Sequence, residues 1–459
     1  MSAEDPRGQL ARLFQEVAGY VDGQRLVAEE AGADPAFAAA THVLAVGKVA
    51  LPMLRGCALA RRSDPRERPA FAPRAPRTLA VVPAPADGTP LTEAAALSLP
   101  TLIIVADHPH PTARSVAAAQ AVLAFVRSIG AGADAPAESA RLLVLLSGGA
   151  SSLLCAPADG LAWEDKRDAI AAVARAGATI RELNIVRKHL SAIKGGRLGL
   201  ETTAPIAVRA LSDVIGDDPA TIGSGPFSPD PSRFTEAIAV VERLGAKLPA
   251  AVRAHLDRGA RGEIPDTPMP ASGALAHVDY RVLAGPARVV DEARAAIARA
   301  GCSTGTLALD VEDTVEVHAA AIGARVRREL DDAPASSGGA PRILVGNGEP
   351  RVVLPASAGR GGRATHLALL VARELAELPE ALRSRVAFLA AGTDDRDGNT
   401  GVSGGIVDGT TWQRARAQGL DPAAALRAFD SLPVLASIGD TVRGPGTSNL
   451  LDLHLLLLP

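Results

Sequence analysis

The chain has 459 residues, of which 47% are hydrophobic and 22% are charged. This composition excludes disorder as the main state, and the length predicts two or three domains at about 100–200 residues each. A formal net charge of −3 and an aromatic fraction of 3% provide no general attraction to nucleic acids or anionic membranes and few rings on which bases could stack.

The three cysteines, Cys57, Cys155 and Cys302, are far apart and form no Cys-x-x-Cys pair. We therefore expect neither a disulfide framework nor a structural zinc site, but buried thiols in a reducing compartment. The first residues are partly acidic and lack the apolar core of a signal peptide, and no apolar run is long enough to span a bilayer. These features favour a soluble cytoplasmic protein that binds neither nucleic acid nor membrane, and they leave a homo-oligomer open.

Short β-like runs alternate with Ala-rich helical stretches, which predicts an α/β fold of βαβ units with mainly parallel sheets. The sites of such sheets lie beyond the carboxyl ends of the strands. The sequence between Asp331 and Pro341 is rich in Ser, Gly and Pro and is the best candidate for a domain boundary. In chain order, the predicted elements are a helix at Gln9–Ala31, strands at His42–Val46, Leu79–Val82 and Leu102–Ala106, a helix at Ser115–Ile129, a strand at Leu142–Leu146, helices at Trp163–Ala174 and Ile180–Ile193, strands at Ile206–Leu211 and Tyr280–Ala284, helices at Ala287–Ala300 and Val315–Leu330, strands at Arg342–Val345 and Arg351–Leu354, a helix at Thr365–Leu378 and a strand at Val386–Ala390.

Two glycine-containing loops directly follow predicted strands. One contains Ser147, Gly148, Gly149 and Ser151; its backbone N–H groups and hydroxyls could form an anion site, or the segment could be a tight turn with a Ser cap. The other places Lys48 after a glycine, where a lysine can reach a phosphate. The residues around it do not form a Walker A loop, and taken alone Lys48 fits a surface lysine equally well.

A stiff loop and a basic segment are further candidates for binding. The loop carries His108 between Asp107 and a proline, and either binds substrate or metal or is a rigid structural turn. In the basic segment, Arg187 and Lys194 fall on one face of the predicted helix that ends at a Gly-Gly pair. Two aligned cations could clamp an anionic substrate, and a solvated basic face is the alternative.

Two acidic loops also follow predicted strands. One contains Asp213 and the other contains Asp394 in a run of acidic and glycine residues. Carboxylates in such loops suit Mg²⁺, and the alternative is local Asx-turn hydrogen bonding. The second loop fails the EF-hand register, because Ile406 stands where the twelfth position requires Glu.

A glycine loop from Gly359 to Ala364 matches the pattern G-x-G-x-x-A. As a dinucleotide fingerprint it is weak, because four residues separate it from the preceding predicted strand and no acidic strand end follows about 20 residues later. The two arginines in the loop, one of them Arg363, speak more directly for binding a phosphate or a carboxylate.

Taken together, these blocks resemble the type-2 glycerate kinase family, also known as glycerate 2-kinases. The resemblance covers nearly the whole chain and rests on many blocks in the same order, which makes it specific. The blocks are AVGKVALPML, DHPHP, LLSGGASSLL, LNIVRKHLSAIKGGRL, LSDVIGDDPATIGSGPFSPD, GNGEPRVVL, GRGGRATHLAL, GTDDRDGNTGVSGGIVDG and GDTVRGPGTSNLLDL.

The resemblance implies a larger Rossmann-like N-terminal domain, residues 1–335, and a smaller MOFRL-type C-terminal domain, residues 336–459, with the active site in the cleft between them. It implies transfer of the γ-phosphoryl group of ATP, with Mg²⁺, to the 2-hydroxyl of D-glycerate or a related small 2-hydroxy carboxylate, and it places Lys48 and Arg363 at catalysis.

The phosphoryl-transfer chemistry suggests roles for the other candidates. Asp213 and Asp394 would hold Mg²⁺, or Asp213 would accept the hydroxyl proton. The anionic acceptor would be oriented by Arg187, Lys194 and His108. The groups expected to bind the phosphates of ATP are Ser147, Gly148, Gly149, Ser151, Gly361 and Gly362. The Ser147 loop could instead hold the carboxylate of the substrate.

The sequence departs from the family pattern near the glycine loop. Ala364, Thr365 and His366 stand where the family usually has Asn-Gln-Glu, and Gly401 replaces another polar side chain. These losses predict a roomier and less selective acceptor site. They also keep open the alternative of a non-catalytic relative that binds a metabolite. The G-x-G-x-x-A pattern keeps open a second alternative, an NAD(P)-dependent hydroxypyruvate or hydroxy-acid reductase.

Overall fold

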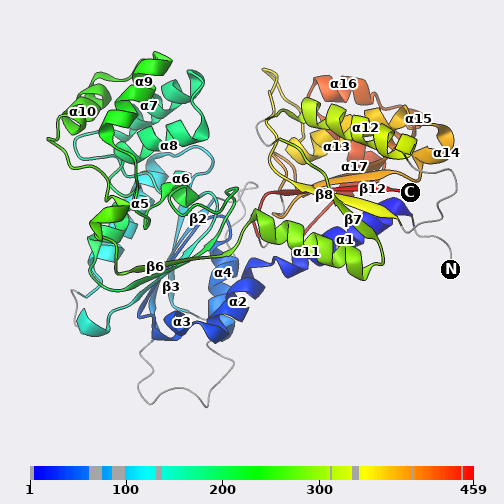
Figure 1. Ribbon diagram of the computed structural model, residues 1–459. Helices are drawn as coiled ribbons and strands as arrows, with labels where there is room; N and C mark the ends of the chain where they lie inside the picture. Colours follow the sequence, from blue (N-terminus) through cyan, green and yellow to red (C-terminus); the bar gives the residue numbers. More distant parts are fainter. Residues whose placement is uncertain are drawn as a thin grey trace. The chain divides into compact units, whose positions relative to one another are not determined.

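The computed structural model describes residues 5–60, 75–84, 99–130, 137–310, 313–332, 341–394, 396–445 and 448–459. The chain forms two compact units (Figure 1): Gly23–Ala284, called here the central unit, and Met1–Asp22 with Gly285–Pro459, called here the terminal unit. The compact units do not coincide with the division expected between residues 335 and 336. The segment from Gly285 belongs with the C-terminal elements because its strand β7 (Ser303–Thr306) pairs with their sheet.

The central unit is built on one parallel sheet, as the alternating pattern predicts. Its strand order is β3-β2-β1-β4-β5-β6, and every pairing is parallel. The middle strands are Val- and Leu-rich and buried along their length, as strands covered on both faces must be. The strands are β1 (His42–Val46), β2 (Arg77–Pro83), β3 (Thr101–Ala106), β4 (Leu142–Leu146), β5 (Ile206–Leu211) and β6 (Val278–Ala284).

Helices of the central unit cover the sheet and also form a separate cluster. α2 and α4 pack together against β1, β4 and β6, α5 packs on β2 and β3, and α7–α10 gather beyond one end of the sheet around their own apolar core. The helices are α2 (Gly23–Ala33), α3 (Pro35–Ala39), α4 (Ala50–Ala60), α5 (Ala113–Arg127), α6 (Ala150–Leu153), α7 (Trp163–Arg175), α8 (Ile180–His189), α9 (Phe234–Leu244) and α10 (Ala250–Ala260).

The terminal unit has a mixed sheet, so the expectation of mainly parallel sheets is wrong here. Its order is β11-β10-β9-β12-β8-β7, and only β7 and β8 pair in parallel. The last strand runs back between β8 and β9 and is antiparallel to both. Besides β7, the strands are β8 (Arg342–Asn347), β9 (Ala387–Gly392), β10 (Gly404–Asp408), β11 (Thr441–Val442) and β12 (Asp452–Leu458).

The predicted strand at Arg351–Leu354 is also wrong. Arg351 forms a single isolated bridge with Thr314, and the next three residues are irregular. Val353 is 79% exposed and Leu354 is 57% exposed, so these apolar side chains face solvent and give the segment no buried face with which to join the sheet.

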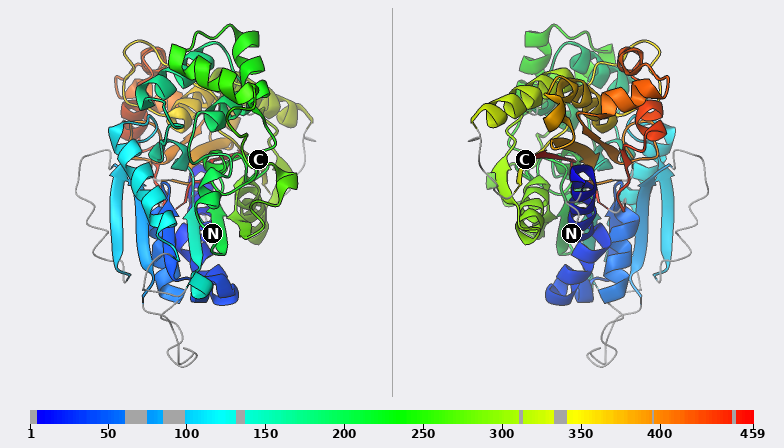
Figure 2. Two further views of the ribbon diagram at one scale, coloured as in Figure 1. Left: turned by 90° about the vertical axis from the view of Figure 1, so that its left-hand side faces the viewer. Right: turned by 90° about the vertical axis from the view of Figure 1, so that its right-hand side faces the viewer.

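Helices cover both faces of the sheet in the terminal unit. α13 packs on β9 and β10, and α12 packs on α13; α1 and α11 lie together on the other face, with α1 dark blue in Figures 1 and 2. The helices are α1 (Pro6–Tyr20), α11 (Pro286–Arg299), α12 (Val315–Asp332), α13 (Arg363–Ala376), α14 (Glu380–Arg383), α15 (Thr411–Ala417), α16 (Pro422–Arg427) and α17 (Ser431–Ser437).

The predicted helix Gln9–Ala31 is two helices that belong to different units. α1 ends at Tyr20 and α2 begins at Gly23. Arg7, in the first turn of α1, forms ion pairs with Asp408 (3.1 Å) and Asp440 (2.6 Å) of the terminal unit. The dipeptide Asp22-Gly23 at the break is typical of a turn, so the predicted helix extends across a signal that should end it. Within the described ranges, no helix is both long and apolar enough to cross a membrane.

Candidate functional site

The loops singled out in the central unit lie at one edge of its sheet. β1, β3, β4 and β5 are parallel and end at residues 46, 106, 146 and 211. Lys48, His108, the Ser147 loop and Asp213 each follow one of these ends within a few residues. The parallel topology therefore places them at the carboxyl edge, where sites of open α/β sheets form.

The loop after β4 is shaped to receive an anion. The Oγ of Ser147 accepts a hydrogen bond from the Val49 N–H (3.1 Å), and the carbonyl of Gly148 accepts one from the Lys48 N–H (2.9 Å), which fixes the loop against the end of β1. Among the described residues, the N–H groups of Gly148, Gly149, Ala150 and Ser151 have no protein acceptor. Four successive unpaired donors form an anion-binding concavity.

Gly149 allows two of the predicted side chains to approach this loop. Its φ of +85° is a conformation that glycine adopts freely. A Cβ at this position would lie 3.0 Å from Cδ2 of His108 and 3.3 Å from Cγ of Lys48. Lys48 is exposed and His108 is exposed. The structure thus gathers Lys48, His108 and the Gly148–Ser151 donors in one place.

Lys194 also reaches this loop, although not from the predicted helix. α8 ends at His189, so the expected helix through Ile193 and the shared helical face of Arg187 and Lys194 are wrong. The Lys194 side chain is buried, and its Nζ donates to the carbonyl and the Oγ of Ser151 (2.9 Å each) and to the carbonyl of Gly223 (3.4 Å). The ammonium therefore lies against the loop Gly148–Ser151, called here the anion loop, on its buried side.

A polar chain connects the loop to Arg187. Ser151 Oγ lies 2.9 Å from Ser224 Oγ, and the Ser224 hydroxyl donates to Oδ1 of Asn184 (3.3 Å). The same Oδ1 accepts from Nη1 of Arg187 (2.7 Å). Arg187 and Lys194 are therefore brought together by side-chain contacts and not by helical spacing.

Three cations near the loop are not paired with a carboxylate of the described residues. Within the described part of the chain, no carboxylate pairs with Lys194, Arg187 or the buried Lys166, whose Nζ donates to the carbonyl of Ala156 (3.0 Å). Burial lowers the pKa of Lys194 well below its usual value, and Lys166 and Arg187 lower it further. Uncompensated buried positive charge is unfavourable unless an anion arrives to neutralise it.

The Asp213 loop is held largely by its own turns. Ser212 Oγ accepts from the Val214 N–H (3.1 Å), and Asp218 accepts from Thr221 Oγ1 (2.6 Å) and from the Ala220 N–H (3.1 Å). Asp213 is half-buried. No group of three or more His, Cys, Asp or Glu side chains in the described ranges is arranged to hold a metal ion.

In the terminal unit, Arg363 is the first residue of α13 and is held by two carboxylates. Its Nε donates to Oδ2 of Asp452 (2.9 Å), and its Nη2 lies 2.9 Å from Oε1 of Glu349. These two carboxylates raise the pKa of the guanidinium despite its burial. Arg363 is thus oriented and fully charged, and an incoming phosphate would compete with its present partners.

The glycine loop before α13 already uses its backbone donors. Gly361 N–H donates to Oδ1 of Asn399 (2.9 Å), Gly362 N–H donates to Oγ1 of Thr365 (2.9 Å), and Arg360 N–H donates to Oδ1 of Asp430 (2.6 Å). The sequence predicts that Gly361 and Gly362 bind phosphate. An anion here would have to rely on arginine side chains or displace these bonds.

Asp397 is a buried carboxylate that sequence reasoning did not select. It accepts from the N–H groups of Ala364 (2.9 Å) and Thr365 (2.7 Å) at the start of α13. Burial raises its pKa to about 6, and Asp452 adds to the shift. Asp394 is close to Asp452, because a Cβ at Gly392 would lie 2.9 Å from the Oδ1 of Asp394 and 3.2 Å from that of Asp452.

The three departures after the glycine loop are structural. Ala364, Thr365 and His366 are all buried, at 1%, 0% and 4% exposure. Thr365 caps the helix and receives a hydrogen bond from Ser431 (3.0 Å), and the His366 ring stacks on Phe429. The structure therefore does not support reading these positions as contacts to the acceptor. Gly401, by contrast, is exposed, and no heavy atom outside its chain neighbours lies within 4 Å of the position that a Cβ would take.

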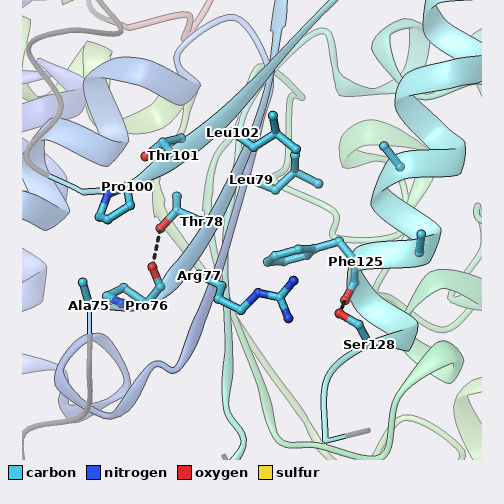
Figure 3. Close-up of a pocket in the computed structure, with 12 residues that line it drawn as sticks. Ala75, Pro76, Arg77, Thr78, Leu79, Pro100, Thr101, Leu102, Phe125 and Ser128 are labelled. Carbon is cyan, nitrogen blue, oxygen red and sulfur yellow. Dashed lines mark hydrogen bonds between the residues drawn. The ribbon is translucent and has the colours of Figure 1, made fainter. Parts of the chain in front are cut away.

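A hollow of about 840 Å³ in the central unit lies away from these groups (Figure 3). It is lined by the amino ends of β2 and β3 and by the end of α5, including Arg77, Leu102 and Phe125. Thr78 and Ser128 donate to neighbouring carbonyls, as the dashed lines show. No predicted site residue lines this hollow, which is at the opposite edge of the sheet from the anion loop.

Comparisons with known proteins match two regions of the chain to family models and most of its length to named relatives. A family model described as a domain of unknown function (DUF4147) matches residues 9–257, and the MOFRL family matches residues 342–452. The chain is 33% identical to a D-glycerate 2-kinase of Thermotoga maritima over 78% of this chain and 80% of that protein, and 32% identical to a glycerate 2-kinase of Pyrococcus horikoshii over 76% of each.

A crystal structure of glycerate kinase from Thermotoga maritima covers 99% of both chains, with a TM-score of 0.77 and 28% identity. The chain belongs to the glycerate 2-kinase family. A similar protein of Agrobacterium vitis, 35% identical over 78% of this chain, carries a provisional name as a hydroxypyruvate reductase. Kinase names are found among relatives from bacteria, archaea and vertebrates.

Membership of the glycerate 2-kinase family supports the α/β fold and the two matched regions expected from the sequence. The individual site residues and an active site in a cleft between two domains stay predictions. Three groups that lie against the predicted residues were not selected from the sequence: Ser224, Asp397 and Asp452. Lys166, which shares the carbonyl of Ala156 with Ser191, was not selected either.

Proposed function

We propose that this protein transfers the γ-phosphoryl group of ATP to the 2-hydroxyl of D-glycerate or of a closely related small 2-hydroxy carboxylate. The observation that carries the proposal is the loop Gly148–Ser151, with four unpaired N–H donors and the buried Lys194 behind it, in a chain of the glycerate 2-kinase family. ATP, the 2-hydroxy acid and its phosphorylated product are all anions. We also propose a cytoplasmic location, where ATP is available.

The anion loop would act by positioning. Backbone N–H groups and a fixed ammonium stabilise negative charge without having to reorganise when it arrives. Phosphoryl transfer requires mainly alignment of donor and acceptor together with neutralisation of charge. The loop would hold phosphates or the acceptor carboxylate, and Arg187 and Lys194 would fix that group from the buried side.

Lys48 and Arg363 are the proposed catalytic residues. Lys48 is exposed at the end of β1 and has its side chain beside Gly149, so its ammonium could follow a phosphoryl group during transfer. Arg363 is preoriented by Asp452 and Glu349. Each would stabilise negative charge on the transferring group.

Mg²⁺ is a proposed cofactor, and the oxygen-rich surroundings of Asp394 fit it. Asp394 and Asp452 both approach Gly392, and Mg²⁺ is commonly held by one or two carboxylates together with substrate phosphates. Asp394 would hold the ion, and Asp213 is the candidate in the central unit, either as a second ligand or as the acceptor of the hydroxyl proton. When bound, the ion would neutralise phosphate charge.

The proposal is tested by incubating the purified protein with Mg·ATP and D-glycerate and following ADP release and the ³¹P spectrum of the product. We expect stoichiometric 2-phosphoglycerate, with no NADH or NADPH oxidation when hydroxypyruvate is offered. Reduction of hydroxypyruvate without phosphoryl transfer would favour the reductase alternative. Ligand binding without turnover of any 2-hydroxy acid would favour the non-catalytic one.

A further inference from the structure

Lys166 of α7 is a buried lysine without a role in the mechanism proposed above. Its side chain is 4% exposed, and its Nζ donates a single hydrogen bond, to the carbonyl of Ala156 (3.0 Å). An ammonium has three donors, so this contact leaves it incompletely satisfied. No carboxylate of the described residues neutralises it.

Lys166 is connected to the segment that carries Lys194. The carbonyl of Ala156 also accepts from Ser191 Oγ (3.1 Å) and from the Ala192 N–H (3.2 Å). Ser191 Oγ in turn accepts from the Lys194 N–H (3.4 Å). The two lysines are close enough for the charge of Lys166 to lower the pKa of Lys194. Lys166 is therefore a second buried cation on the inner side of the anion loop, farther from the loop than Lys194.

The use of lysine in this chain is unusually sparse. Of its 48 basic residues, five are lysines: Lys48, Lys166, Lys188, Lys194 and Lys247. Three of the five are buried in the central unit, and of these Lys188 has an acidic partner, Asp230 (3.1 Å). Arginine supplies nearly all of the positive surface charge, while Lys166 and Lys194 place compact ammonium groups where a guanidinium with five donors would be hard to satisfy.

A charge balance indicates what kind of anion this arrangement takes. Lys166, Lys194 and Arg187 form no ion pair with a carboxylate of the described residues. Burial lowers the pKa of both lysines, so the three groups carry their full positive charge once an anion binds beside them. A monocarboxylate would neutralise one of them, whereas a polyphosphate would neutralise all three. Charges in a poorly solvated site interact over longer distances than charges in water, so the Lys166 ammonium still attracts a multiply charged ligand without touching it.

We propose that Lys166 is a positioning residue that selects polyphosphate, so that the Gly148–Ser151 loop with Lys194 binds the phosphate chain of the nucleotide and not the carboxylate of the acceptor. This inference rests on the proposed function. It assigns to one substrate a loop that the family resemblance and the geometry leave open to both.

The test compares Lys166→Met and Lys166→Gln with the matched control Lys247→Met. Lys247 is an exposed lysine of the same unit with no shared contact, so its substitution removes the same net charge. Calorimetry would measure binding of tripolyphosphate, inorganic phosphate and D-glycerate to the full chain, and initial rates would give KM for ATP and for D-glycerate separately.

We expect both Lys166 variants to bind tripolyphosphate about tenfold to thirtyfold more weakly, with a smaller loss for phosphate, a matching rise in KM for ATP and no change for D-glycerate. The control should behave as the wild type. The melting temperature of the ligand-free Met variant should stay the same or rise, because a buried unpaired charge is removed. A purely structural role would instead lower it and weaken all ligands alike.

Unchanged tripolyphosphate binding in the variants would overturn the inference, and so would a loss confined to D-glycerate. If Lys166→Met does not fold, Lys166→Gln decides, because its amide can still donate to Ala156. A wild type that binds tripolyphosphate through Lys166 but phosphorylates no acceptor would refute the kinase and leave this inference standing. If the wild type phosphorylates D-glycerate and the Lys166 variants bind tripolyphosphate as tightly as the wild type, the proposed function stands and this inference is refuted.

Discussion

The ammonium of Lys194 donates to both the backbone carbonyl and the hydroxyl of Ser151, at 2.9 Å each. One buried cation thereby fixes the position of the last donor in the anion loop and brings positive charge to its back. The contact joins residues 43 positions apart, and the local sequence of either one gives no sign that the two meet.

Replacing Lys194 with Met should weaken anion binding strongly while preserving the fold. A buried charge contact to an anion is worth about 2–5 kcal/mol, so kcat/KM should fall by about 30-fold to about 5,000-fold. The measurement is steady-state kinetics beside a thermal melt, with Lys247→Met as the control. Equal kcat/KM values for Lys194→Met and Lys247→Met would show that Lys194 does not contribute to substrate binding or catalysis.

Lys48→Ala should lower kcat and leave stability unchanged. The side chain is exposed, so its removal creates no cavity, while loss of one transition-state charge contact corresponds to about 10²–10³ in rate. Rates and melting temperatures of Lys48→Ala and Lys247→Ala should be compared. If phosphorylation continues at the wild-type rate, Lys48 is only a surface lysine.

The carboxyl-edge loops could be predicted from the sequence because a parallel sheet fixes where they must lie. Val43–Val46 and Leu142–Leu146 are strongly apolar runs, followed by Gly47 and by Ser147-Gly148, and their pairing brings Lys48 beside the Ser147 loop. Local pattern was sufficient there because strand direction and strand ends determine the arrangement.

The remaining parts depend on contacts between distant residues. α8 ends at His189, after which Ser191 bridges Pro157, and helical periodicity cannot reveal that bridge. Arg363 is oriented by Asp452, 89 positions away. β12 inserts between β8 and β9, a pairing that an apolar run alone cannot assign.

Activity should require Mg²⁺ or Mn²⁺. Excess EDTA should abolish phosphoryl transfer and added Mg²⁺ should restore it, and Asp394→Asn should raise the Mg²⁺ concentration needed for half-maximal rate, because it replaces a carboxylate ligand with a neutral amide. Asp291→Asn, at a largely exposed acid of α11, is the control. Full activity in EDTA would contradict the prediction, and zinc-only activity would also count against it.

Thr365→Ala should change stability and not acceptor choice. Thr365 is fully buried, caps α13 through the Gly362 N–H and contacts Ser431. Loss of these bonds should lower the free energy of unfolding by about 1–2 kcal/mol. The ratio of kcat/KM for D-glycerate to that for larger 2-hydroxy acids should not move. A changed ratio would return this position to the acceptor site and revive the prediction of relaxed selectivity.

His454 should make the protein less stable in acid. The side chain is 0% exposed on β12, between Phe388 and His318, and both of its ring nitrogens lack a partner among the described residues. Burial lowers its pKa to about 4 from an ordinary value of 6.5. The folded state therefore holds the ring neutral, while the unfolded chain protonates it near pH 6.5. Its stabilising contribution is present above pH 6.5 and is lost as the pH falls toward 4.

Between pH 7 and pH 5 this single group should lower the free energy of unfolding by about 2 kcal/mol. His454→Leu removes the titration together with two unsatisfied polar atoms, so the variant should be at least as stable as the wild type at pH 7 and should lose less stability on going to pH 5. Denaturant unfolding of both proteins at the two pH values measures the difference. Because His366 also has a pKa lowered by burial to about 4, some acid dependence should survive in the variant. If the free energy of unfolding falls equally in the two proteins between pH 7 and pH 5, the pKa of His454 does not differ between the folded and unfolded states.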